Sequence, residues 1–189
     1  ICGISNIQDI ALLNLSGASM GGIPSFSFRL FKALSEAKIN VIMITQATSE
    51  HSICVGISKS DAQAALEAIS EEFETEILLH KIDKPTVEED LSVVALVGSH
   101  MKNQVGISGK MFNTLGRNGI SVKAIAQGSS ERNITAIIAK PDLKKALNTL
   151  HESFFLSESK KINLFVVGVG NVGKAFLSQV QRQQTMLAK

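Results

Sequence analysis

Tryptophan and tyrosine are absent from this chain of 189 residues, and there are only two cysteines. No run of basic residues occurs and the formal net charge is only +2, so nucleic-acid binding is not expected. Cys2 and Cys54 fit no metal-site spacing and are typical of reduced thiols in a cytoplasmic protein. No apolar run approaches the roughly 18 residues that cross a bilayer, and no signal peptide is recognisable.

The four histidines have no cysteine or acidic partners at the spacing of metal ligands. We therefore predict no metal site, and no residue pattern in the chain predicts catalysis. The chain begins at Ile1 without methionine and stops at Lys189 inside a helical pattern. These two ends predict a piece of a longer protein.

An internal repeat is the most informative feature present. Residues 10–69 align with residues 91–150 without a gap, at an offset of 81, and 18 of the aligned residues are identical. The densest match places the segment from Ile44 to Glu50 over the segment from Ile125 to Glu131. Two copies are too few for a solenoid, so the repeat predicts a pair of similar small domains. A polar motif that recurs in both favours binding or sensing over catalysis.

Each copy predicts the order strand, helix, strand, strand, helix. The first strands end at Gly17 and Gly98, where a turn can form at low steric cost. The first helix of copy one starts near Pro24, and Ser60 with Gln63 forms a capping-box pattern before the second helix. The predicted strands are 10–16, 39–46 and 52–58 in copy one, with 91–97 and 120–127 in copy two.

The strand at 120–127 and the second helix carry periodic apolar stripes. Residues 120, 122, 124 and 126 alternate with more polar ones, which predicts a strand with one covered face. On the second helix, Ala62, Ala65, Leu66, Ile69 and Phe73 recur as Leu143, Ala146, Leu147, Leu150 and Phe154.

The copies are expected to differ in their closing strand. Copy one continues into a predicted strand at 75–82, whereas residues 151–161 of copy two are polar. The missing strand of copy two could come from residues 1–7, which would make copy one an insertion within copy two. Deletion of residues 1–7 should then destabilise mainly copy two.

The tail contains a dinucleotide fingerprint in the expected context. A nearly continuous apolar run at 161–167 precedes Gly168-Val-Gly170-Asn-Val-Gly173, and a helical pattern follows. A strand, G-x-G-x-x-G and a helix together bind a pyrophosphate at the helix N-terminus. The chain stops before the second strand of such a fold, so we expect this piece to bind no dinucleotide alone.

The order of these motifs resembles one family of enzymes. The segment Ile1-Cys-Gly-Ile-Ser-Asn6, the two glutamine motifs and Gly168–Gly173 look like the middle of a bifunctional aspartokinase–homoserine dehydrogenase. The resemblance implies an α+β chain of two ferredoxin-like βαββαβ ACT domains, followed by the first strand and helix of a truncated Rossmann domain. The implied divisions are a stub at 1–9, ACT domains at 10–83 and 84–158, and the Rossmann start at 159–189.

The resemblance also implies feedback control. L-Threonine would bind the ACT pair and inhibit the flanking kinase, which uses ATP and Mg²⁺, and the dehydrogenase, which uses NAD(P)H. At least a dimer through the ACT domains is expected. The residues implied or proposed for the effector are Gln46, Gln127, Asn40, Ile44, Met20, Gly21, Gly22 and Ser121; those for the dinucleotide of the longer protein are Gly168, Gly170, Asn171, Val172 and Gly173.

The chemistry of free threonine suits such a site. A glutamine amide has both donors and an acceptor, so it can meet a hydroxyl and a charged end together. The paired glycines before the first helix would let backbone N–H groups approach the carboxylate. Copy two lacks these glycines and has Ser121 in place of Asn40, so Gln46 is the more strongly predicted glutamine.

Two alternatives stay open at this stage. The chain could be a dimerisation module without a ligand, or a module that responds to lysine or another amino acid. A dehydrogenase whose nucleotide site dominates is a third interpretation, which the truncated fingerprint disfavours.

Overall fold

The computed structural model describes residues 1–17, 22–47, 52–99, 101, 104–128, 132–156, 166–168 and 170–183. Its contacts divide the chain into a first unit, Ile1–His151, and a second unit, Glu152–Lys189. The strands are β1 (Gly3–Ser16), β2 (Val41–Ala47), β3 (Ser52–Ser58), β4 (Thr86–Val97), β5 (Val122–Gln127) and β6 (Asn133–Ala139). The helices are α1 (Phe26–Glu36), α2 (Ala62–Glu72), α3 (Glu74–Leu78), α4 (Ile107–Arg117), α5 (Leu143–Phe155) and α6 (Asn171–Arg182), with 3₁₀ turns at Lys59–Asp61 and Lys140–Asp142.

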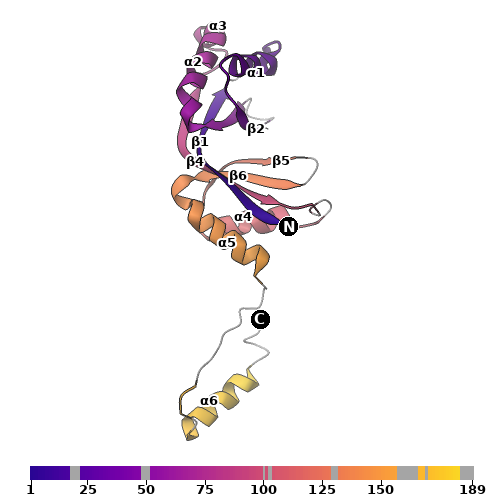
Figure 1. Ribbon diagram of the computed structural model, residues 1–189, viewed down its shortest axis with the longest axis vertical. Helices are drawn as coiled ribbons and strands as arrows, with labels where there is room; N and C mark the ends of the chain where they lie inside the picture. Colours follow the sequence, from indigo (N-terminus) through magenta and orange to yellow (C-terminus); the bar gives the residue numbers. More distant parts are fainter. Residues whose placement is uncertain are drawn as a thin grey trace. The chain divides into compact units, whose positions relative to one another are not determined.

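All six strands form one antiparallel sheet in the order β2-β3-β1-β4-β6-β5 (Figure 1). The two central strands are long, and each serves both halves of the sheet. The first half contains β2, β3, residues 10–16 of β1 and residues 86–90 of β4. The second half contains β5, β6, residues 91–97 of β4 and residues 3–7 of β1, where Gly3–Ile7 pairs with Val97–Val93.

The strands β1 and β4 pass from one half of the sheet to the other at two aspartates that occupy equivalent positions in the repeat. Asp9 and Asp90 have left-handed backbones, with φ of 57° and 55°, and the β1–β4 register shifts beside them. Each aspartate bonds to the lysine of a 3₁₀ turn: Lys140 Nζ is 2.6 Å from Asp9 Oδ1, and Lys59 Nζ is 2.8 Å from Asp90 Oδ1. The second pair raises the pKa of Lys59 and lowers that of Asp90. Two matching ion pairs thus flank the crossover.

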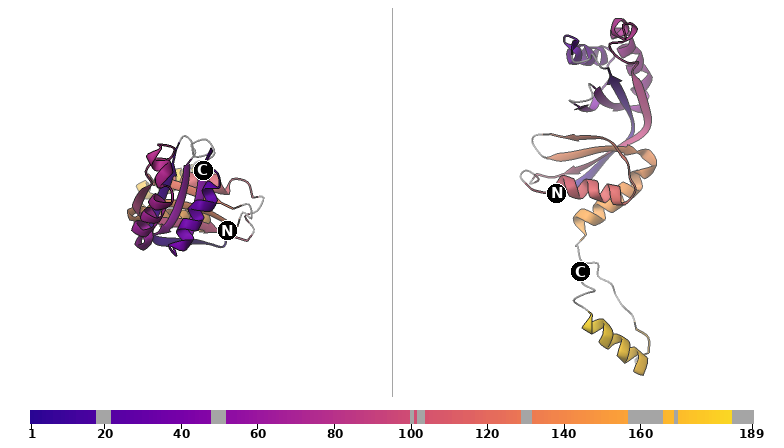
Figure 2. Two further views of the ribbon diagram at one scale, coloured as in Figure 1. Left: turned by 90° about the horizontal axis from the view of Figure 1, so that it is seen from above. Right: turned by 180° about the vertical axis from the view of Figure 1, so that it is seen from behind.

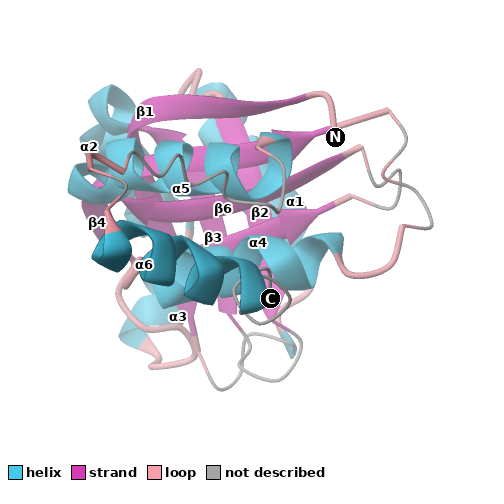
Figure 3. Cartoon of the chain, turned by 90° about the horizontal axis from the view of Figure 1, so that it is seen from below, coloured by secondary structure: helices cyan, strands magenta, loops and turns pink. Residues whose placement is uncertain are grey.

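Helices cover the outer side of each half (Figures 1 and 2). Alternate residues of β1 and β3 pack against α1 and α2, and Leu13, Leu30 and Ile69 are buried there. The inner sides of the halves meet near the crossover, where β2 contacts β5 and Leu12, Met43 and Ile137 pack together. The cartoon in Figure 3 shows the strands as an inner layer, with α4 and α5 over the second half. The second helix of each copy buries its stripe: Ala62, Ala65 and Ile69 in α2, with Leu143, Ala146 and Leu150 in α5.

The predicted strand at 75–82 is wrong, because α3 occupies Glu74–Leu78. Helical spacing brings Glu72 and Glu76 onto one side, where both accept hydrogen bonds from Arg29 of α1. Arg29 also lies over the Phe73 ring, 4.6 Å from its centroid. The place of the predicted strand in the sheet is taken by residues 86–90 of β4.

One local expectation is corrected by the structure. Ser60 does not cap α2, since its hydroxyl bonds to Ser58 and to Asp61. The structure also adds a reason for glycine at position 17, where a Cβ would lie 2.5 Å from the Lys81 carbonyl oxygen. At Gly98 a Cβ would meet the Met101 side chain.

The predicted single stripe of the strand at 120–127 is split by a β-bulge. The register shifts between Val122, which pairs with Ile138, and Ala124, which pairs with Ile137. Val122 therefore lies on the helix side of the sheet with Ile125 and Gln127, whereas Ala124 and Ala126 pack on the inner side. A bulge reverses the alternation on which the prediction depended.

Candidate functional site

A cavity of about 220 Å³ lies in the second half, between the end of β5 and the start of α4. Gln127, the last residue of β5, contributes its exposed side chain and pairs with Ile134 of β6. The approach to α4 supplies the other side. The cavity is lined by Met101, Gln104, Val105, Ile107, Ser108, Gln127 and Ile134.

The polar groups of this cavity are a helix N-terminus, two glutamines and a serine. The Ser108 hydroxyl donates a hydrogen bond to Oε1 of Gln127 over 3.2 Å. Gly106 precedes α4 with φ 90°, and neither a side-chain cap nor an acidic residue occupies the first turn. The first N–H groups of a helix have no intrahelical partner, and the helix dipole favours an anion beside them. This end of α4 can therefore accept a carboxylate.

The rest of the cavity wall is apolar. Met101 and Ile134 are almost completely buried, at 3% and 1% exposure, and Ile107 is half-buried. None of the seven lining residues is charged. A zwitterion held here would meet backbone N–H groups and neutral amides at its charged ends, and aliphatic carbon elsewhere.

The corresponding place in the first half is built differently. Gln46 lies on β2, is exposed and pairs with Ile53, as Gln127 pairs with Ile134. However, Phe26 stands at the position of Ile107, is 7% exposed, and packs on Phe73 with ring centroids 4.9 Å apart and the ring planes tilted by 36°. Ile107 of the second half is a smaller side chain and is only half-buried.

The other predicted effector residues are scattered. Gly22 is exposed beside α1, and Met20 and Gly21 lie outside the described residues. Ile44 is 47% exposed on edge strand β2. Asn40 and Ser121 are exposed residues before β2 and β5. The bulge after Val41 breaks the alternation in β2, so alternation no longer places Asn40 on the face of Gln46.

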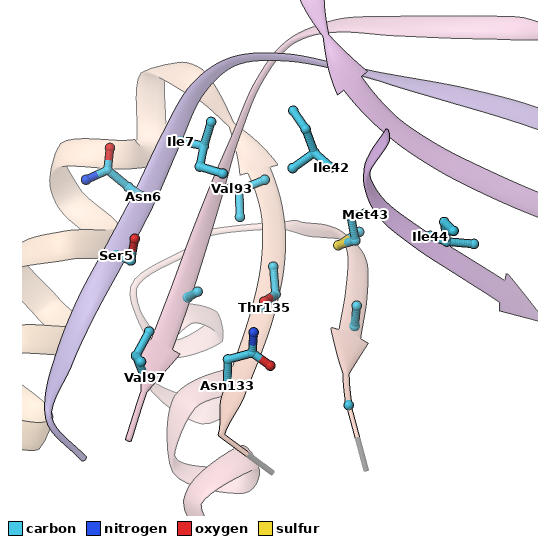
Figure 4. A pocket seen from close by; sticks show the side chains of 13 residues that line it. Ser5, Asn6, Ile7, Ile42, Met43, Ile44, Val93, Val97, Asn133 and Thr135 are labelled. Atoms are coloured by element: carbon cyan, nitrogen blue, oxygen red, sulfur yellow. The ribbon is translucent and has the colours of Figure 1, made fainter. Parts of the chain in front are cut away.

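A larger cleft of about 430 Å³ lies between the inner sides of the two halves. Figure 4 shows Ser5, Val93 and Thr135 on neighbouring strands of the second half, with Ile42 and Met43 on β2 across from them. No charged side chain lines it. This cleft forms where residues 3–7 join the second half.

In the second unit, the glycines of the fingerprint surround the start of α6. Gly168 has φ of 90°, Gly170 precedes the helix, and Asn171 and Val172 begin it. A Cβ on Gly173 would clash with the Gly168 carbonyl oxygen, so this turn requires glycine. Residues 161–165 of the predicted strand lie outside the described residues, and 166–167 have no regular structure. A Rossmann strand and helix are therefore not shown.

The described residues form no metal cluster and no membrane-spanning helix. That part of the chain holds no group of three or more histidine, cysteine or acidic residues that could bind a metal ion. Cys54 donates a hydrogen bond to Asn14 Oδ1 over 3.2 Å, and a backbone hydrogen bond from Ser99 is the main cause that lowers the pKa of exposed Cys2. No helix in the described ranges is long and apolar enough to cross a membrane.

Comparison with known proteins identifies the repeated unit. Residues 13–73 and 94–154 match the sequence profile of the ACT domain. The chain is 39% identical over 187 residues to a bifunctional aspartokinase/homoserine dehydrogenase of Haemophilus influenzae, across 99% of this chain and 23% of that protein. A chloroplastic bifunctional aspartokinase/homoserine dehydrogenase of Arabidopsis thaliana is 34% identical over 185 residues, across 98% and 20%. The chain thus spans less than a quarter of the length of these relatives.

A solved structure shares the fold of the first unit. It is the ligand-free regulatory subunit of aspartate kinase from Thermus thermophilus, with a TM-score of 0.67 and 26% sequence identity. The alignment covers 82% of this chain and 98% of that one. The tandem arrangement of the two halves is therefore that of a known regulatory subunit.

Proposed function

Because this chain belongs to the ACT domain family, we propose that it is the regulatory region of an aspartokinase–homoserine dehydrogenase and binds an amino-acid effector, L-threonine. Gln127 carries the proposal: the predicted glutamine lines a cavity beside the uncapped start of α4. The α4 N-terminus would take the carboxylate, the amides of Gln127 and Gln104 the hydroxyl and ammonium, and Ile134 the methyl group. Gln46 is proposed as the counterpart in the first half.

Inhibition requires that threonine bind one arrangement of the protein better than another. The two halves share β1 and β4, so a change of packing in one half is transmitted to the other through continuous strands. We propose that this coupling reaches the kinase and the dehydrogenase of the longer protein. ATP with Mg²⁺ and NAD(P)H would act in those domains.

The test is calorimetry and thermal unfolding of this chain with L-threonine, lysine, methionine and NADPH. Threonine should raise the midpoint of unfolding by binding the native state. Gln127→Ala should lower the affinity of the second half, and Gln46→Ala that of the first. Absence of a shift at millimolar threonine would count against the effector site; binding of lysine instead would change the effector.

A dimerisation role is favoured by two exposed isoleucines. Ile44 and Ile125 occupy equivalent positions on the edge strands β2 and β5, and are 47% and 45% exposed. Unpaired sheet edges with apolar side chains favour pairing with a second chain. We propose at least a dimer through these ACT domains, which sedimentation of the wild-type chain and of Ile44→Lys and Ile125→Lys variants would test.

The glycines at the start of α6 support a further part of this proposal. Gly168 has a φ of 90°, which favours glycine, and a Cβ on Gly173 would clash with the Gly168 carbonyl oxygen, as in a turn suited to a pyrophosphate. We propose that this is the beginning of the dehydrogenase's nucleotide-binding domain. The 189-residue chain should give no calorimetric signal with NADPH.

A further inference from the structure

We propose that Ser108 positions the amide of Gln127 and so determines which effectors the second-half cavity accepts. This inference rests on the proposed function and adds a residue that controls specificity. Ser108 lies in the first turn of α4 and Gln127 ends β5, so a single hydrogen bond joins the helix and the strand at the cavity. Both residues line that cavity.

The direction of this hydrogen bond fixes the chemistry that the amide presents. A glutamine amide can present either its oxygen, which accepts, or its NH₂ group, which donates, and the two orientations have similar shapes. The Ser108 hydroxyl donates to Oε1 of Gln127 at 3.2 Å. The oxygen is thereby engaged, and Nε2 keeps its two donors for a ligand.

Where the ligand's side chain would lie, the cavity then presents mainly hydrogen-bond donors, while the Gln104 amide remains to meet the α-ammonium. The first N–H groups of α4 donate at one side, and the Gln127 NH₂ donates at the other. Such a site binds a ligand through oxygen atoms, one set from a carboxylate and another from a side-chain hydroxyl. It disfavours a side-chain ammonium, which needs acceptors and would face N–H groups instead. Among α-amino acids, the class selected carries a hydroxyl on a short side chain.

The repeat supplies a matched control for this role. Ser27 and Gln46 occupy the positions of Ser108 and Gln127 in the first half. No hydrogen bond joins Ser27 to Gln46 in the described part of the chain, whereas the second-half pair is joined. Ser27→Ala therefore makes the same chemical change without removing the proposed positioning contact.

The experiment is calorimetry on the 189-residue chain in a Gln46→Ala background, which leaves the second-half site. L-Threonine is compared with L-2-aminobutyrate, which lacks the hydroxyl. Ser108→Ala should weaken threonine binding about tenfold and leave 2-aminobutyrate binding unchanged, because only the hydroxyl meets the oriented amide. Ser108→Thr should restore threonine affinity, and Ser27→Ala should change neither ligand.

The remaining outcomes separate this inference from the proposed function. Equal weakening of both ligands by Ser108→Ala would mean a structural role and overturn the positioning proposal. The positioning proposal would also be overturned if Ser108→Ala weakened the binding of neither ligand. It would likewise be overturned if the Gln46→Ala chain bound no threonine while the chain with Gln46 intact still bound it. If the wild-type chain binds no threonine at all, the proposed function itself fails. Gln127→Ala, which removes the amide, should reduce threonine affinity to that of 2-aminobutyrate.

Discussion

The two halves of the sheet have the same sequence of elements but use aromatic and ionic side chains differently. The first half closes its helix layer with Phe26 stacked on Phe73 and with Arg29 bound to Glu72 and Glu76. In the second half, the positions of Phe26, Arg29 and Glu72 are occupied by Ile107, Lys110 and Ser153. Among the described residues, Phe26 packs on Phe73 at the start of α1, whereas the start of α4 lines a cavity.

This difference indicates that the two copies of a duplicated domain can use the start of the first helix differently. A large ring at the start of α1 stabilises the first half through buried apolar area. A smaller side chain at the start of α4 leaves room for a ligand beside Gln127. The same fold therefore supports two helix starts that are packed differently, and mutations can test each side of this contrast.

The largest effect is expected from deletion of residues 1–7. The deletion removes the strand segment that pairs with Val93–Val97 and leaves an edge of the second half unpaired. We expect a loss of roughly 3–5 kcal/mol, at about 1 kcal/mol for each lost hydrogen bond. Hydrogen exchange should lose protection in β5 and β6 more than in β2 and β3. Equal loss in all four strands would contradict the division into halves.

Phe26→Ala should be the next most damaging change. It removes a buried ring and leaves a cavity under α1, so we expect destabilisation of about 3 kcal/mol. Ile107→Ala, the matched change in the second half, should cost only about 1 kcal/mol, because Ile107 is half-buried beside an existing cavity. Urea unfolding of both variants measures the difference. Similar losses would mean that the halves are packed alike.

Acid should weaken the first half through Glu76. The hydrogen bond from Arg29 is the main cause that lowers the pKa of Glu76 below its ordinary value of 4.5, and it raises the pKa of Arg29. The stabilisation is complete above that ordinary value and is lost as the pH falls through the lowered pKa. Glu76→Gln should cost about 1.5 kcal/mol at pH 7 and remove this pH dependence. Unfolding midpoints from pH 7 to 3 provide the test; an unchanged profile in Glu76→Gln would exclude the role.

Ser92→Ala should stabilise the protein slightly. The Ser92 hydroxyl on β4 is completely buried and has no hydrogen-bond partner among the described residues. Copy one has Ala11 at the same position, also completely buried. We expect a gain of about 1 kcal/mol for Ser92→Ala and a similar loss for Ala11→Ser. Thermal unfolding of Ser92→Ala, of Ala11→Ser and of the variant that carries both changes measures whether stability rises or falls in each.

Much of the first unit could be predicted from the repeat. The return strand at 52–58 and the apolar stripe of the second helix are present as predicted, because each depends on local periodicity. The helix at 74–78 could not be predicted locally, since Thr75, Ile77 and Leu79 also alternate like a strand. It is fixed by Arg29, which is distant in sequence. The bulges in β2 and β5 likewise leave no trace in periodicity.

The candidate site was only partly predictable. The recurrence of glutamine at equivalent positions of the two copies predicted Gln127, but the paired glycines of copy one made Gln46 the more strongly predicted residue. The described cavity lies in the second half and is lined by Ile107, Ser108 and Gln127, whereas residues 18–21 of copy one lie outside the described residues. Ser108 recurs as Ser27 in the sequence, so only the structure shows that one of the two serines contacts its glutamine.

The crossing of β1 and β4 also has a consequence for how the chain is made. Residues 3–7 pair with residues that are synthesised much later, and residues 86–90 complete the first half only after its helices exist. Neither half can finish folding as it emerges from the ribosome, because each waits for a segment of the same late strand. Long-range pairing of this kind slows folding and exposes unpaired edges in the meantime. The first half should therefore close only once β4 has been synthesised, and the second half later still, once β5, β6 and α5 have followed.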